Sequence, residues 1–222
     1  MLSDPTLQHA TESPPLPDAR DPRPATSPPR DAPIGPTTEL ERSLLALLAR
    51  VAEFRIDPGG THAVRVGHLA ADLALALEMD EAFCEMIRWA APLHDLGTVG
   101  VPDHVLTHAP PLSGPDANVM KLHTSVIEVL LGREEGPALV EMIRRIAVGH
   151  HERWDGRGYP EGLRGASIPI EARIVAVADT YQSLTHRMPR ADAMKEIMAE
   201  AGAAFDPQVV GALVRVAARA AA

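Results

Sequence analysis

Histidine and aspartate side chains recur along this chain in a way that suits metal chemistry. Seven of them share this pattern: His62, His94, Asp95, His123, His150, His151 and Asp179. They follow one another at intervals of about 30 residues, roughly the length of two helices with their connections. A chain running up and down a helical bundle returns to the same end after each such interval, so these side chains can meet. Imidazole and carboxylate together suit zinc, iron or manganese.

Seven potential ligands exceed what one ion needs, which suggests two metal ions that share a bridging carboxylate. The remaining histidines are interpreted as surface, satisfied core or tail residues: His9, His68, His104, His108 and His186. The seven stand out by position. His94–Asp95 lies just before Gly97, and His150–His151 lies just before a glycine-rich loop. Functional groups are commonly displayed where regular elements open onto loops.

A helical bundle has to position these residues. Thr38–Glu41 has the form of a capping box, and Thr61 and Asp80 are the expected caps of the next two helices. Further helical patterns cover about 61–79, 80–95, 116–131, 137–151, 170–185, 190–201 and 206–219, with loops over 97–115 and 152–169. The apolar run Ile174–Ala178 has no second strand to pair with and is assigned to a buried helix. The sequence predicts an all-α protein.

The first 37 residues differ from the rest. They hold ten of the 21 prolines and almost no apolar periodicity, so they cannot bury enough surface to offset the entropy of ordering. We predict a disordered proline-rich tail over 1–37, with a proline-rich ligand for a partner domain as the alternative. Residues 38–222 form the expected folded domain.

Composition excludes several functional classes. A net charge of −9 with only 3% aromatic residues argues against binding DNA or RNA. Cys84 is the only cysteine, so a disulfide framework is excluded and a reducing compartment is expected. No apolar run approaches the ~20 residues that cross a bilayer, and no secretory signal follows Met1. We expect a cytoplasmic protein that binds neither DNA nor membranes.

One stretch makes the chain recognisable. Residues His150–Pro160, reading HHERWDGRGYP, resemble the signature of HD-GYP domains, a branch of the HD metal-dependent phosphohydrolases. The likeness continues in His94–Gly97, Met120–His123, Ala172–Asp179 and Phe205–Pro207, and spans roughly residues 40–217. The resemblance implies an HD-domain helical bundle. It also implies hydrolysis of cyclic di-GMP, or a related cyclic dinucleotide, to linear pGpG or GMP by a hydroxide bound to two metal ions.

The resemblance also implies roles for particular residues. One ion would be held by His62, His94, Asp95 and Asp179, and the second by Asp95, His123, His150 and His151. Asp95 would bridge the two ions, and Asp95 and His94 would carry the catalysis. The ions would be iron or manganese. The loop Gly158–Tyr159–Pro160 is implicated in contacts with GGDEF domains.

Arginines near the signature loop and after the Leu184–Thr185 pair are candidates for substrate contacts. They are Arg153, Arg157, Arg187 and Arg190. Ordinary surface salt bridges are an equally good interpretation of any one of them.

The chain departs from the family pattern around the substrate. Thr98 stands where the family has a phosphate-contacting lysine, and Met188 stands where it has an arginine. Ile127 replaces a glycine, and His108–Pro110 replaces a K-P-G segment. Loss of such a contact predicts activity lowered by about 10²–10³-fold. Members with three metals carry a glutamate four residues before the first histidine, where this chain has Pro58, so we predict two.

Three functions therefore remain open. The first is a cyclic dinucleotide phosphodiesterase, slow or with shifted specificity. The second is a catalytically degenerate interaction or sensor module that keeps the fold and the metal. The third is a nucleotide phosphohydrolase of the broader HD class. Retention of all seven candidate ligands favours the phosphodiesterase.

Overall fold

The computed structural model describes residues 36, 38–57, 59, 61–106, 113–132 and 136–220. Within them the chain is helical and contains no strand beyond an isolated bridge between Ala201 and Phe205. The all-α prediction is thus confirmed for the described part. The predicted tail falls almost entirely outside it and stays a prediction. The elements are α1 (Glu39–Glu53), α2 (His62–Ala76), α3 (Glu81–Ala90), η1 (Ala91–Leu93), η2 (Leu96–Gly100), α4 (Asp103–Leu106), α5 (Gly114–Lys121), α6 (His123–Leu131), α7 (Ala138–Gly149), η3 (Gly165–Ser167), α8 (Ile170–Arg187), α9 (Arg190–Ala199) and α10 (Pro207–Ala220).

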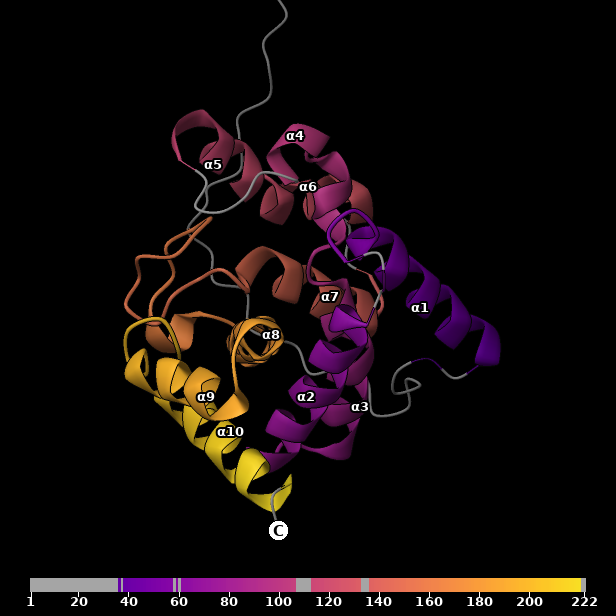
Figure 1. Ribbon diagram of the computed structural model, residues 1–222. Coiled ribbons are helices and arrows are strands. Elements are labelled where there is room, and N and C mark those ends of the chain that lie inside the picture. The colour runs from indigo at the N-terminus through magenta and orange to yellow at the C-terminus, as the bar shows by residue number, and fades with distance from the viewer. Residues whose placement is uncertain are drawn as a thin grey trace, which may run out of the picture. The chain divides into compact units, whose positions relative to one another are not determined.

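Helix α8 lies at the centre of the fold. Figure 1 shows it almost end-on, with α2, α7, α9 and α10 around it, and each of these helices contacts it. The apolar run Ile174–Ala178 lies inside α8 and is fully buried, as expected for a buried helix. Alanines on α2 and α8 let the helix axes approach closely, and Leu73 and Ile87 fill the space between α2 and α3. This core fixes the positions of the helix ends that carry the candidate ligands.

Two predicted caps are present and one is replaced. Thr38 and Glu41 form the capping box of α1, and Asp80 Oδ1 accepts from Phe83 N at 2.7 Å. The prediction that Thr61 caps α2 is wrong. Its backbone is helical rather than extended, and its hydroxyl accepts from Arg65. Asp57 instead accepts from the backbone N–H groups of Thr61 and His62, at 3.1 and 3.0 Å.

Two helix boundaries also differ from the expectation. The helix predicted over 80–95 ends at Ala90, because Pro92 has no N–H to continue it, and a 3₁₀ turn follows. The helix predicted over 116–131 is divided at Leu122 into α5 and α6. The carbonyls of Met120 and Lys121 accept from the side chains of His123 and Thr124, so they are lost to an unbroken helix. Both corrections fall beside candidate ligands.

Helix α1 buries only a narrow face. Ala49, Ala52 and Glu53 are buried, and the helix contacts η1, η2 and α2. Its large apolar side chains point outward instead, with Leu40 68% and Leu47 55% exposed. The end of α1 is tied to η2 by polar contacts, because Thr98 Oγ1 donates to Ala52 O at 3.0 Å and Arg55 donates to the carbonyls of Thr98 and Val101.

Candidate metal centre

The seven candidate ligands come from five segments. His62 opens α2, and His94 and Asp95 lie between η1 and η2. His123 opens α6, and Asp179 lies on α8. His150 and His151 follow the last residue of α7. The structure brings these five segments together at one point, although His94 and Asp95 occupy a turn rather than the helix predicted for them.

Asp95 lies at the centre of the cluster. One carboxylate oxygen, Oδ1, lies 3.5 Å from His123 Nε2 and 3.4 Å from His150 Nε2. The other oxygen, Oδ2, lies 3.6 Å from His94 Nε2. The two oxygens therefore face different histidines, which is the arrangement that a carboxylate bridging two ions requires.

Asp179 faces the other side of the cluster. Its Oδ1 lies 3.0 Å from His62 Nε2 and 3.9 Å from His94 Nε2. His94 thus lies between the two aspartates. Donor atoms around one ion lie about 3–4 Å apart when each is about 2.0–2.2 Å from the metal. These separations fit that requirement.

Backbone carbonyls orient three of the histidines. Nδ1 of His94 lies 2.9 Å from Ala91 O, Nδ1 of His123 lies 2.7 Å from Met120 O, and Nδ1 of His150 lies 3.1 Å from Ile146 O. A carbonyl only accepts, so each Nδ1 carries the proton and each Nε2 presents a lone pair. This is how proteins fix metal-binding imidazoles.

The inward-facing nitrogens make no hydrogen bond within the part of the chain that the structure describes. Nε2 of His94, His123 and His150 is buried and makes no hydrogen bond. Buried polar atoms normally form hydrogen bonds. Three buried nitrogens that converge without one are the arrangement expected of ligands to a cation. The donor atoms form two groups, each with all its atoms within 4.8 Å of one another: Asp95 with His123, His150 and His151, and Glu53 with His62 and His94. The residues present therefore fit divalent metal ions.

Glu53 is the member of these groups that the sequence did not predict. Its Oε1 lies 4.0 Å from His62 Nε2, and the side chain is buried although it ends an otherwise exposed helix. Its position nine residues before His62 was visible in the sequence. Nothing local distinguished it from a solvent-facing glutamate. Pro58, where the family resemblance placed a possible glutamate, lies outside the described residues.

Neighbouring charges within the cluster shift one another's pKa values. Partial burial alone would raise the pKa of Asp95, but His94, His150 and His123 hold it well below the usual range. Burial is outweighed in the same way at His94, whose pKa is raised by Asp95 and Asp179. Burial lowers the pKa of His151, and His150 and His123 lower it further. His151 is therefore neutral at pH 7, the form that binds metals.

Two glycines allow backbone segments to approach the centre closely. A Cβ on Gly97 would lie 1.9 Å from His123 O, so only glycine lets the turn that carries Asp95 lie against α6. A Cβ on Gly158 would lie 2.3 Å from Arg153 N, so the loop after it packs against the residues that follow His151. Both contacts set the position of a candidate ligand.

The signature loop covers one histidine. Tyr159 stacks on His151 with ring centroids 4.8 Å apart, and its N–H donates to His151 O at 3.2 Å. Lys121 Nζ lies 5.2 Å from the centroid of the Tyr159 ring. Burial raises the pKa of the Tyr159 hydroxyl, so this group stays protonated at neutral pH. Lys121 belongs to the Met120–His123 stretch that resembles the family, although the sequence alone assigns it no role.

The four candidate substrate arginines are exposed or paired with carboxylates other than the candidate ligands. Arg153 forms ion pairs with Asp155 at 2.9 Å and with Glu200 at 3.4 Å. Arg157, Arg187 and Arg190 are exposed. Their proposed contacts with substrate stay predictions.

The position of the missing family lysine is closed. Thr98 is 1% exposed, and its hydroxyl is used by Ala52 O. It therefore supports the junction of η2 with α1. Met188, at the other departure from the family pattern, caps the end of α8 in an extended conformation. The departure at His108–Pro110 lies outside the described residues.

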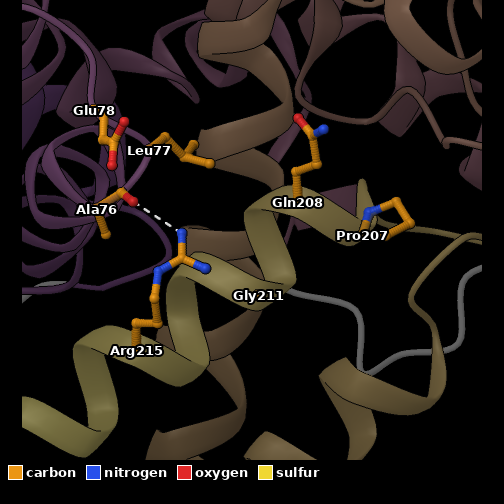
Figure 2. A pocket seen from close by; sticks show the side chains of 7 residues that line it. All are labelled: Ala76, Leu77, Glu78, Pro207, Gln208, Gly211 and Arg215. Carbon is orange, nitrogen blue, oxygen red and sulfur yellow. Dashed lines mark hydrogen bonds between the residues drawn. The ribbon is translucent and has the colours of Figure 1, made fainter.

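A surface hollow away from the metal cluster lies beside a contact that joins two helices. It lies between the end of α2 and the start of α10 and is lined by Ala76, Leu77, Glu78, Pro207, Gln208, Gly211 and Arg215. Figure 2 shows Arg215 reaching back to Ala76, where its Nη2 donates to the backbone carbonyl at 2.8 Å. Carbonyls at a helix end have no partner in their own helix. Arg215 satisfies one of them and joins the two helices.

Comparison with known proteins identifies the family of this chain. The HD domain family matches residues 46–209 of the chain. The chain belongs to the HD domain family. HD domain phosphohydrolases bind divalent metals, in agreement with the donor groups described above. The resemblance to HD-GYP phosphodiesterases is confirmed by the relatives that follow.

Curated relatives of this HD domain are cyclic dinucleotide phosphodiesterases. A cyclic di-GMP phosphodiesterase of Thermotoga maritima is 37% identical over 179 residues, covering 78% of this chain and 48% of the relative. The cyclic di-GMP phosphodiesterase response regulator RpfG of Xanthomonas campestris is 41% identical over 186 residues, covering 80% and 48%. The chain thus spans about half the length of these relatives.

A solved structure shares the HD domain fold. The crystal structure of a cyclic GMP-AMP-specific phosphodiesterase of Vibrio cholerae superimposes with a TM-score of 0.59, at 20% identity, over 78% of this chain and 48% of that one. At this identity the likeness shows the fold alone. Among the described residues, no helix is both long enough and apolar enough to cross a membrane.

Proposed function

We propose that this HD domain is a metal-dependent phosphodiesterase that hydrolyses cyclic di-GMP, or a related cyclic dinucleotide, to linear pGpG or GMP. The observation that carries the proposal is the convergence of three unsatisfied imidazole nitrogens on Asp95. The names of the relatives supply the substrate class. We take the cofactor to be two divalent ions, iron or manganese, which mixed imidazole and carboxylate ligands suit.

Two ions held this way would supply an acidified water and neutralise charge on the phosphodiester. The residues of the chain prepare for that chemistry. Asp95 faces His94 with one oxygen and His123 and His150 with the other, so it would bridge the two ions. His94 lies between Asp95 and Asp179. Neutral histidines leave the site with net positive charge, which favours an anionic substrate. Lys121, held over Tyr159, adds a further cation beside His151.

The proposal includes a low rate. Thr98 is buried against α1 and cannot offer the charge of the family's lysine, and Met188 carries no charge. The first loss would remove a contact to a substrate phosphate, and the second a contact that recognises the dinucleotide. The same two observations support the second candidate, a module that retains metal but has lost turnover. A GGDEF domain as partner of the Gly158–Pro160 loop remains a prediction.

The purified full chain, prepared without oxygen, tests the proposal. It is loaded with Mn²⁺ or Fe²⁺ and incubated with cyclic di-GMP or cyclic GMP-AMP, and linear products are separated by chromatography. We expect slow formation of the linear dinucleotide, lost in Asp95→Asn and retained in Glu171→Gln, a buried glutamate paired with Arg145 on α7. Metal-loaded protein without product would support the binding module. Cleavage of nucleoside triphosphates alone would support the broader class.

A further inference from the structure

A buried carboxylate joins α1 to the metal centre. Glu53 ends α1 and is only 2% exposed, although most large side chains of that helix face solvent. Its Oε2 accepts from Ala63 N at 2.9 Å, in the first turn of α2. This contact explains one of the two carboxylate oxygens.

The other oxygen accepts no hydrogen bond from any of the described residues. Oε1 of Glu53 is buried and makes no hydrogen bond. Its neighbours are the imidazoles of His62 and His94. Oε1 lies 4.0 Å from His62 Nε2, and donor atoms of all three residues lie within 4.8 Å of one another. The bond to Ala63 N needs only Oε2. The position of Oε1 beside the two imidazoles therefore needs a separate explanation.

A cation between these three side chains satisfies all of them. A buried carboxylate with an unused oxygen is costly unless it is paired or bound to a metal. The nitrogen of His94 that faces it is likewise unsatisfied. Donor atoms about 2.0–2.2 Å from one ion lie about 3–4 Å apart, and the 4.0 Å between Glu53 Oε1 and His62 Nε2 is at the upper end of that range. Burial of the group also excludes the interpretation as an exposed acidic cluster.

We propose that Glu53 is a metal ligand, and that it holds an ion together with His62 and His94 on the side of the centre that faces α1. The inference rests on the metal centre of the proposed function and adds an eighth ligand to it. It supplies a carboxylate nine residues before His62, although Pro58 occupies the position at which a glutamate was sought. Helix α1 thereby becomes part of the site.

Metal binding to Glu53→Gln tests this directly. The glutamine carbonyl can still accept from Ala63 N, which leaves the amide NH₂ group on the side of the ion, and that group is a donor that cannot bind a cation. The metal-free full chain is titrated with Mn²⁺ by calorimetry, and bound metal is counted by elemental analysis after dialysis. We expect one class of site to weaken by at least about 10-fold, with the sites that include His123 and His150 retained. Glu171→Gln controls for the loss of a buried carboxylate, and circular dichroism checks the fold.

The outcomes are distinct. One bound ion fewer, or one weakened class of site, in Glu53→Gln supports the proposal. Wild-type stoichiometry and affinity in this variant overturn it and leave Glu53 as an anchor of α2. Wild-type protein that binds no divalent ion refutes the metal centre itself. Anomalous diffraction from Mn²⁺-loaded wild-type crystals gives a readout that does not depend on the variant's folding, because manganese must lie about 2.2 Å from Glu53 Oε1.

Discussion

Individual side chains decide whether this metal centre can turn over a substrate. The donor atoms are oriented by backbone carbonyls, so their geometry does not depend on substrate. The contacts that would hold the phosphates are different, because they would come from long, exposed side chains. At Thr98, the position of the family's lysine, the side chain is buried and bonded to Ala52 O instead.

Thr98→Lys is expected to damage the protein rather than restore activity. The lysine would replace a side chain that is 1% exposed and bonded to Ala52 O. Overpacking and a buried charge should lower the free energy of unfolding by about 2–3 kcal/mol, measured by urea denaturation. Thr98→Val, which loses only the hydrogen bond, should cost about 1 kcal/mol. Faster turnover with undiminished stability in the lysine variant would contradict this packing argument.

Lys121→Ala is expected to weaken substrate binding. Lys121 lies over Tyr159, which in turn stacks on His151, so its charge lies beside the part of the centre that holds His151. We expect KM for the cyclic dinucleotide to rise about 10-fold with a smaller change in kcat, measured by steady-state kinetics. Lys195→Ala is the matched control, because Lys195 is exposed and paired with Asp192. Equal effects in both variants would remove Lys121 from the site.

Residue types that carry chemistry could be identified from the sequence, whereas burial could not. The seven histidines and aspartates recur at helical-bundle spacing, and the structure places them together. Glu53 escaped notice because a glutamate at a helix end is normally solvated. Its burial arises because α1 packs against η1, η2 and α2. The sequence pattern does not show that these elements pack there.

Helices position the centre through their ends, and these ends depend on close backbone approaches. Gly97 lies against the first residue of α6, and Asp57 holds the first turn of α2. Sequence patterns located the caps of α1 and α3 because Thr38 and Asp80 act locally. They failed at Thr61 and Leu122, where other side chains compete for the backbone groups. The same limit applies to α1, whose apolar side chains do not mark its buried face.

Gly97→Ala is expected to separate η2 from α6. The added Cβ would lie 1.9 Å from the carbonyl oxygen of His123, and backbone cannot yield as a side chain can. We expect a loss of about 3 kcal/mol in stability and weaker Mn²⁺ binding, because Asp95 and His123 would move apart. Gly100→Ala is a matched control, since its Cβ would meet only the methyl groups of Val126, at 3.0 Å. If both variants bind Mn²⁺ equally well, the close approach does not set the site.

The start of α7 should respond to acid through Glu141. Its Oε1 accepts from Gly136 N at 3.0 Å and its Oε2 from Arg144. Partial burial would raise the pKa of Glu141, but these bonds outweigh it and lower the pKa. The stabilisation is therefore present above the unfolded-state pKa and is lost as the pH falls through the folded-state value. Glu141→Gln should cost about 0.5–1 kcal/mol at pH 7, and this cost should shrink as the pH falls through the folded-state pKa of Glu141. A difference in urea stability that persists at low pH would argue against this.

At the scale of the whole molecule, the metal centre connects most of the fold. Its candidate ligands run from Glu53 on α1 to Asp179 on α8. The helical class and the order of the helices followed from periodicity and turn residues. The packing that closes these helices around one point did not, because it depends on contacts between residues distant in sequence.

Metal should stabilise the folded chain strongly. An ion that binds only the native state adds about 2.7 kcal/mol at 100 times its dissociation constant. We therefore expect Mn²⁺ to raise Tm by several degrees and EDTA to reverse the change, measured by scanning calorimetry. Asp95→Ala should abolish the response, whereas Glu171→Gln should keep it. Equal melting of the metal-free and Mn²⁺-loaded wild type would contradict a centre built into the core.

The distances in sequence between the ligands have a consequence for assembly. No two neighbouring segments supply a complete donor group, because His94 must meet Asp179 and Asp95 must meet His150. An unfolded chain is therefore expected to bind divalent cations weakly. The ligands come together only when the helices pack, so metal binding and folding should be coupled.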